Sequence, residues 1–104
     1  MTYSERAAQI WPVLVLASKN RQLLSYSLLS ELIGIPQQGL SWSLEKIHAY
    51  CIANSLPPLT AIVVSEITGL PGHGFTAATA GQVPEAQARV FKHSWNPITP
   101  SQLP

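Results

Sequence analysis

The chain has 104 residues, of which 46% are hydrophobic and only 11% are charged, and its net charge is +1. This length fits one domain, and the composition excludes a disordered chain, since disordered chains are rich in charge and poor in apolar residues. The near-neutral balance is far from the basic charge of most nucleic-acid-binding domains. With so few charges to hydrate its surface, the chain is expected to bind a protein partner or to self-associate.

A helical pattern opens the chain at Ser4, whose hydroxyl can cap the first free amides. Apolar residues then recur at helical spacing and predict one buried face. They are Ala7, Ile10, Val13, Leu14 and Ala17. Pro12 interrupts the pattern, because inside a helix it removes a hydrogen bond and clashes with the preceding turn. Two alternatives remain open: the helix kinks at Pro12, or a short turn precedes a helix that begins near Trp11.

A second helix is predicted over residues 26–33. Leu23 and Leu24 before it either form a short strand or enter the helix directly. Ser25 can cap the helix. Gly34 then suits the left-handed conformation that commonly follows a helix end.

A third helix is predicted from Gln37 to about Asn54. Pro36 favours a sharp start because its backbone angle is already close to the helical one. The apolar stripe of this helix consists of Leu40, Leu44, Ile47 and Cys51. The chain has one cysteine, which excludes an internal disulfide, and a reduced buried thiol is expected at this position.

The rest of the chain is predicted to contain a strand, a loop and a last helix. Residues 59–64 are rich in β-branched side chains and favour a strand. Residues 65–74 have the Pro-Gly chemistry of a tight turn and predict a hairpin loop, or wing. After a small, polar loop at 76–83, a helix is expected from about residue 84 to 93, followed by an extended tail that Trp95 pins to the core.

Together these elements predict a small α+β domain of the winged helix-turn-helix type, with three or four helices and a short β-hairpin. The domain covers residues 1–95, and residues 96–104 form the extended tail. In such domains the third helix described above is the one presented to a partner.

Residues 26–75 resemble the C-terminal DNA-binding domain of alkylguanine-DNA alkyltransferases and alkyltransferase-like proteins. The matching positions in the first motif helix and the turn after it are Tyr26, Leu29, Ile33, Gly34 and Pro36. The resemblance implies a winged helix-turn-helix. The family's reactive cysteine, in a Pro-Cys-His-Arg motif after the strand, is replaced here by Val-Ser-Glu-Ile at residues 64–67. The arginine that the family inserts into DNA, expected near residues 38–40, is also absent. The resemblance therefore implies the scaffold and none of the alkyl-transfer chemistry.

Four polar residues near the start of the third helix are candidates for reading DNA in the major groove. They are Gln37, Gln38, Ser41 and Glu45. Glutamine can make paired hydrogen bonds to adenine. The nearby cations Lys19, Arg21 and Lys46 are opposed by Glu31 and Glu45, which leaves one positive charge to hold phosphates. The alternative is that the two glutamines form the solvated first turn of a helix.

Trp42 is the candidate anchor for a protein partner, because it lies well off the apolar stripe of its helix and exposed tryptophans are frequent interface hot spots. Ala49 and Ile52 flank it, and the 69–75 loop offers an apolar tip at Leu70 beside His73. The alternative is that Trp42 packs beneath the first helix or the tail.

Catalysis, metals and membranes are not favoured. His48 and His73 could assist Ser65 or Glu66 in acid–base work, but no spacing brings them within hydrogen-bond reach. The histidines lie on separate elements without the spacing of zinc motifs. No cofactor motif, signal peptide or apolar run of about 20 residues is present, and a cytoplasmic protein is expected.

The sequence thus predicts a non-catalytic recognition module that binds a protein partner, or a second copy of itself, through the third helix and the wing loop. Such modules include accessory factors of bacterial or phage systems. The alternative function is a DNA-binding regulator that uses the third helix.

Overall fold

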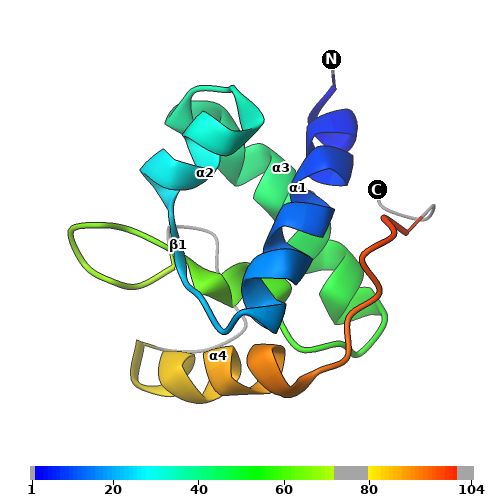
Figure 1. Cartoon of the computed structure of the whole chain (residues 1–104), viewed down its shortest axis with the longest axis vertical. Coiled ribbons are helices and arrows are strands. Elements are labelled where there is room, and N and C mark those ends of the chain that lie inside the picture. The colour runs from blue at the N-terminus through cyan, green and yellow to red at the C-terminus, as the bar shows by residue number, and fades with distance from the viewer. Residues whose placement is uncertain (1, 72–79, 101–104) are drawn as a thin grey trace.

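The computed structural model describes residues 2–71 and 80–100, and this part of the chain forms four α-helices and two very short strands (Figure 1). The helices are α1 (Tyr3–Lys19), α2 (Tyr26–Ile33), α3 (Gln37–Ala53) and α4 (Val83–Lys92). The strands are β1 (Leu24–Ser25) and β2 (Val63–Val64), and two 3-10 turns are η1 (Leu59–Ile62) and η2 (Ala80–Gln82). In Figure 1, α4 lies below the group formed by α1, α2 and α3.

Helix α1 begins at Tyr3, before the start that a cap at Ser4 would give, so the prediction of a Ser4 cap was wrong. Thr2 is the cap: its hydroxyl accepts a hydrogen bond from the Glu5 amide at 3.1 Å, and the Glu5 carboxylate accepts one from the Thr2 amide at 3.1 Å. This reciprocal pair is a capping box, whose Thr-x-x-Glu signature is visible in the sequence. The helix continues through Pro12 to Lys19, which excludes a start near Trp11.

The turn between α2 and α3 forms as its residues predict. The Ser25 hydroxyl accepts a hydrogen bond from the Leu28 amide at 3.1 Å and so caps α2. Gly34 ends the helix with a φ of 81°, and its amide donates to the Ser30 carbonyl at 2.8 Å. Pro36 occupies the cap position of α3. These contacts confirm the predicted helix, tight turn and helix.

The predicted β-hairpin was wrong. Of residues 59–64, the first four form the 3-10 turn η1, in which the Ala61 amide donates to the Pro58 carbonyl at 2.9 Å. Only the last two form a strand, and β2 pairs in parallel with β1, with Leu24 opposite Val63. Residues 59–64 are buried throughout, and a fully buried run lacks the apolar–polar alternation that would distinguish strand from helix.

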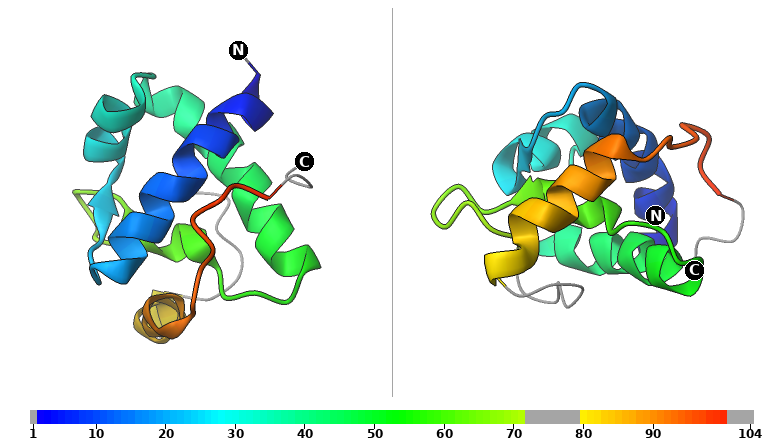
Figure 2. Two further views of the ribbon diagram at one scale, coloured as in Figure 1. Left: turned by 45° about the vertical axis from the view of Figure 1, so that its right-hand side comes forward. Right: turned by 90° about the horizontal axis from the view of Figure 1, so that it is seen from below.

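The segment after α4 is fixed to the core by two tryptophans, which confirms the predicted role of Trp95. The ring of Trp95 is buried and packs edge-on against Trp11, with 5.8 Å between ring centroids. The indole N–H of Trp95 donates to the Val90 carbonyl at 2.9 Å. The Trp11 indole N–H in turn donates to the Asn96 carbonyl at 2.9 Å. Figure 2 shows this segment, in red, running beside α1.

The C-terminal segment also repairs the hydrogen bond that Pro12 breaks. A residue at position 12 of a continuous helix would donate its amide to the Ala8 carbonyl, but proline has no N–H. The Thr99 hydroxyl donates to that carbonyl at 2.8 Å instead. A proline is therefore accommodated inside α1 partly because Thr99, 91 positions from Ala8, supplies the missing donor.

Replacing Thr99 by valine should lower the free energy of unfolding by about 1 kcal/mol, since the Ala8 carbonyl loses its donor. Most of this loss should disappear when Pro12 is replaced by alanine, because the new backbone N–H can donate to the same carbonyl. Urea unfolding of the two single variants and the double variant measures the coupling. An equal cost of Thr99→Val in both backgrounds would contradict this account.

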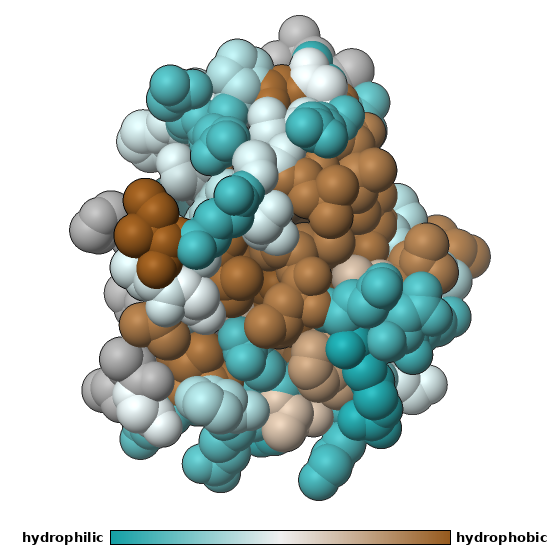
Figure 3. Space-filling view, turned by 60° about the vertical axis from the view of Figure 1, so that its left-hand side comes forward, coloured by the Kyte–Doolittle hydropathy of each residue, from teal (hydrophilic) through white to brown (hydrophobic). Residues whose placement is uncertain are grey.

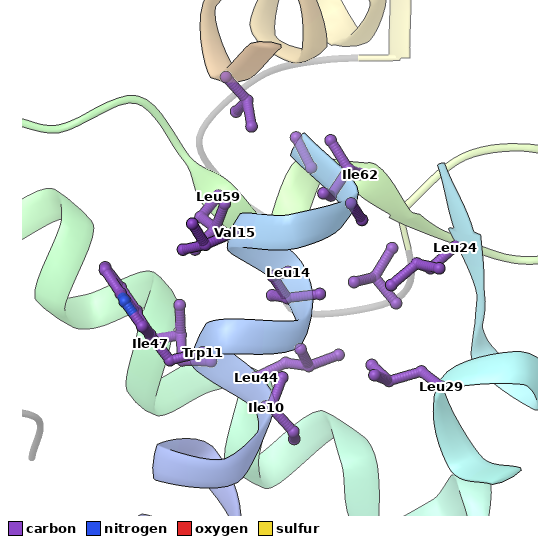
Figure 4. Packing of buried hydrophobic residues seen from close by; sticks show 14 of the residues in the cluster. Ile10, Trp11, Leu14, Val15, Leu24, Leu29, Leu44, Ile47, Leu59 and Ile62 are labelled. Carbon is purple, nitrogen blue, oxygen red and sulfur yellow. The ribbon is translucent and has the colours of Figure 1, made fainter. Parts of the chain in front are cut away.

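Helices α1 and α3 cross each other and enclose a large part of the core (Figures 2 and 4). Tyr3 contacts Trp42 and, eight residues further along each helix, Trp11 contacts Tyr50. Fully buried side chains from α1, α2, α3 and η1 meet between them. They include Ile10, Leu14, Leu29, Ile47, Leu59 and Ile62. This packing fixes one face of α3 inward and leaves the other face in solvent.

Candidate protein-binding surface

The outward face of α3 carries most of the residues that the sequence singled out. Gln37, Gln38, Ser41, Trp42 and Glu45 are exposed, and Lys46 is half-buried. The stripe predicted to face the core is buried as expected, including Cys51. Because the inward positions recur every three or four residues, the candidate residues fall on the opposite side of the helix.

Trp42 forms the aromatic centre of this face. Its side chain is 56% exposed. Its ring stacks on that of Tyr3 at the start of α1, with 6.0 Å between centroids and 26° between planes, and Tyr3 is itself 51% exposed. Trp42 therefore lies off the buried stripe, as predicted, and contacts α1 at its edge rather than being covered by it. No local pattern points to Tyr3, because its contact with Trp42 depends on how α1 packs against α3.

The described part of the loop after β2 exposes Ile67 more than Leu70, the predicted apolar tip. The Ser65 amide donates to the Leu70 carbonyl and the Gly69 amide donates to the Ser65 carbonyl, both at 2.8 Å, which closes the loop. Leu70 is drawn into this closure and is half-buried, whereas Ile67 is 95% exposed. Of residues 65–71, Ile67 is thus the most exposed apolar side chain, and Leu70 as a binding residue stays a prediction. His73 lies outside the described residues.

A pocket of about 290 Å³ joins the start of α3 to this loop. Its lining consists of Tyr26, Ser27, Gln37, Ser65, Glu66 and Ile67. The two regions predicted to act together, the third helix and the loop, therefore meet at one place, with the start of α2 as its third side. Gln37 was the only lining residue chosen as a binding residue from the sequence.

Hydrophobic surface continues from this region over α2. Leu28 and Leu32, one turn apart on α2, are 43% and 57% exposed. With α2, β1 and the loop turned toward the viewer, Figure 3 shows a brown hydrophobic band that crosses this side between polar areas. This band and the face of α3 are the parts of the surface best suited to apolar contact with another molecule.

Most of the positive charge lies far from the start of α3. The exposed cations Lys19, Arg21, Arg89 and Lys92 flank the junction of α1 and α4, where the Ser18 hydroxyl donates to the Val90 carbonyl at 3.0 Å. This junction is at the opposite end of α1 from the contact between Tyr3 and Trp42. A 17-residue helix spans about 25 Å, so these cations cannot hold phosphates beside the first turns of α3.

Of the residues considered for catalysis, the structure describes His48, Ser65 and Glu66, and His48 lies apart from the other two. His48 is buried, and its Nδ1 lies 3.5 Å from the Thr60 hydroxyl. Burial lowers the pKa of His48, partly opposed by Glu45. Burial likewise raises the pKa of the Cys51 thiol, which keeps it protonated and unreactive. Ser65 and Glu66 line the pocket, but His48 does not.

Comparison of the chain with protein-family models, curated protein sequences and solved structures found no match. The resemblance to alkyltransferase domains therefore stays a prediction. Among the described residues, no three potential ligands of the histidine, cysteine, aspartate or glutamate type come together to hold a metal ion. None of the helices described has the length and apolar character that crossing a membrane requires.

Proposed function

We propose that the chain is a non-catalytic recognition module that binds a protein partner through the outward face of α3 and the adjoining 65–71 loop. The observation that carries this proposal is the exposed pair formed by Trp42 and Tyr3. A tryptophan brings a large apolar area to an interface at a small cost in side-chain entropy, and a few such residues supply most of the binding energy in protein complexes.

The same proposal treats α2, the Gly34 turn and α3 as the helix-turn-helix of a winged-helix-like domain, the arrangement that the alkyltransferase resemblance implies. Support comes from the capped start of α2, the left-handed Gly34 and Pro36 at the cap of α3. In this arrangement the loop after β2 takes the position of a wing. The function of the helix-turn-helix is then to hold α3 and the loop at a fixed angle to the partner.

DNA binding by α3 is the alternative, and the charge distribution favours it less. The candidate face carries Lys46, which is half-buried and follows Glu45 directly. The half-buried Arg6 lies nearby but donates to the Ile33 carbonyl at 3.4 Å, and the other four cations lie at the other end of α1. Neutralisation of phosphates supplies most of the affinity of non-specific DNA binding and makes it strongly dependent on salt. The face of α3 has little to offer for that purpose.

Affinity capture with the immobilised protein tests the proposal. Replacing Trp42 by alanine should weaken capture of the partner about tenfold or more, as truncation of an interface anchor does. The fold should be retained, because more than half of the side chain is already in solvent. Circular dichroism checks the fold, and mass spectrometry identifies the captured proteins.

The matched control is Leu16→Ala on α1, which removes a side chain that is 61% exposed and should leave capture unchanged. Equal capture by the wild-type protein and the Trp42 variant would contradict the proposal. A shift of duplex DNA that is lost steeply with added salt and depends on Gln38 would instead establish the alternative.

A further inference from the structure

The charged side chains divide the molecule into an acidic half and a basic half. The half that carries α2, the loop and the first parts of α1 and α3 contains four glutamates and two cations, for a net charge of −2. They are Glu5, Glu31, Glu45 and Glu66, with Arg6 and Lys46. The other half has a net charge of +3, from one glutamate and four cations: Glu85, Lys19, Arg21, Arg89 and Lys92. The two halves together give the net charge of +1 of the whole chain.

Stabilisation of helix ends explains the positions of most cations in the basic half, but not the positions of most glutamates in the acidic half. Lys19 lies in the last turn of α1, and Arg89 and Lys92 lie in the last turn of α4, where cations stabilise the carbonyl end of a helix. Glu5 is similarly engaged in the capping box of α1. Glu66 lies on a loop, outside any helix, and has no such structural role.

Glu66 is one of the residues that line the pocket between α2, α3 and the loop. The described lining contains this one carboxylate and no lysine or arginine. The remaining polar groups are hydroxyls and an amide, each with an oxygen that can accept a hydrogen bond. The phenol ring of Tyr26 adds a surface on which a cation can lie, and the exposed Ile67 adds apolar surface at the rim.

We propose that this pocket binds the cationic side chain of an arginine or lysine from the protein partner. The cation pairs with Glu66 and donates to the hydroxyl oxygen of Ser27 and the amide oxygen of Gln37, while its methylenes contact Ile67. The Ser65 hydroxyl oxygen already accepts from the amides of Ile67 and Thr68, and so holds the loop that carries Glu66. The starts of α2 and α3 carry partial positive charge. Ser25 caps α2, whereas α3 has no side-chain cap, and the full negative charge of Glu66 outweighs the partial charge of that one helix start. This inference rests on the proposed function, which it refines by giving the chemistry of the partner.

The test uses small probes whose binding is followed by the backbone amide signals in NMR spectra of the labelled protein. The probes are N-acetyl-arginine amide, its uncharged analogue N-acetyl-citrulline amide and inorganic phosphate. The arginine probe should shift the amides of Ser27, Ser65 and Glu66. Glu66→Gln should weaken its binding about fivefold, the upper end of what an exposed ion pair contributes. Glu85→Gln, which removes an exposed carboxylate on α4, outside both the pocket lining and the face of α3, should leave it unchanged.

Three results would overturn the inference: equal binding of the citrulline and arginine probes, equal binding by the wild-type protein and the Glu66 variant, or stronger shifts of these amides with phosphate. The captured partner supplies a separate readout. Capture that depends on Trp42 but not on Glu66 would overturn this inference and leave the proposed function in place. Capture independent of Trp42, with the arginine probe still bound at the pocket through Glu66, would overturn the proposed function alone.

Discussion

Replacing Trp95 by alanine is expected to lower the free energy of unfolding by about 4 kcal/mol, the range seen when a buried tryptophan is truncated. The ring is 5% exposed, packs edge-on against Trp11 and has its N–H bonded to the Val90 carbonyl. Its removal leaves a cavity between α1 and the end of α4 and frees the segment that carries Thr99. Urea unfolding followed by circular dichroism measures the change.

Trp95→Phe separates packing from hydrogen bonding. Phenylalanine keeps an aromatic ring against Trp11 but has no N–H for the Val90 carbonyl, so the loss should be smaller than for alanine, about 2 kcal/mol, with contributions from the lost bond and the smaller ring. A cost below about 1 kcal/mol for Trp95→Ala would show that the C-terminal segment is not part of the cooperative core.

Replacing Leu29 by alanine should cost about 3 kcal/mol and should loosen α2 in particular. Of the eight residues of α2, all of which the structure describes, Leu29 alone is buried. Its loss removes the main apolar contact that holds the helix to the core. Hydrogen exchange of the α2 amides should therefore accelerate more than that of α1 or α4, because local opening of α2 becomes less costly than global unfolding.

Leu32→Ala is the control for this prediction. Leu32 lies on the same helix but is 57% exposed, so its truncation should change the free energy of unfolding by less than about 0.5 kcal/mol. Similar costs for Leu29→Ala and Leu32→Ala would indicate that α2 is held by its turn and cap rather than by burial. Because α2 also forms one side of the pocket, binding of the arginine probe should weaken in the Leu29 variant.

The parts of the fold that depend on neighbouring residues could be predicted from the sequence. Ser25, Gly34 and Pro36 act within one turn of the chain, through a side-chain cap, a left-handed backbone angle and a fixed φ. These local effects operate in almost any surroundings. The boundaries of α2 and α3 followed from them.

The parts that depend on tertiary contacts could not be predicted. The pairing of Leu24 with Val63 joins two segments that no local pattern relates. The continuity of α1 through Pro12 involves a hydroxyl from Thr99. In both cases the partner lies far along the chain, and its position is set by how the helices pack.

The candidate site shows the same division. The position of Trp42 off the buried stripe follows from helical periodicity, whereas its exposure and its stacking on Tyr3 depend on how α1 packs against α3. The pocket lining from Ser65 to Ile67 was missed as a binding site because the loop was expected to continue a hairpin. Its actual course, after the parallel strand β2, places Glu66 beside the start of α3.

The arrangement of the three tryptophans gives the protein two separate optical reporters. Trp11 and Trp95 are buried against each other, so their fluorescence is shielded from dissolved quenchers and follows the integrity of the core. Trp42 is open to solvent on the face that we assign to binding. Iodide or caesium ions should therefore quench mainly Trp42, and a partner that covers α3 should protect it while the emission of the buried pair stays constant.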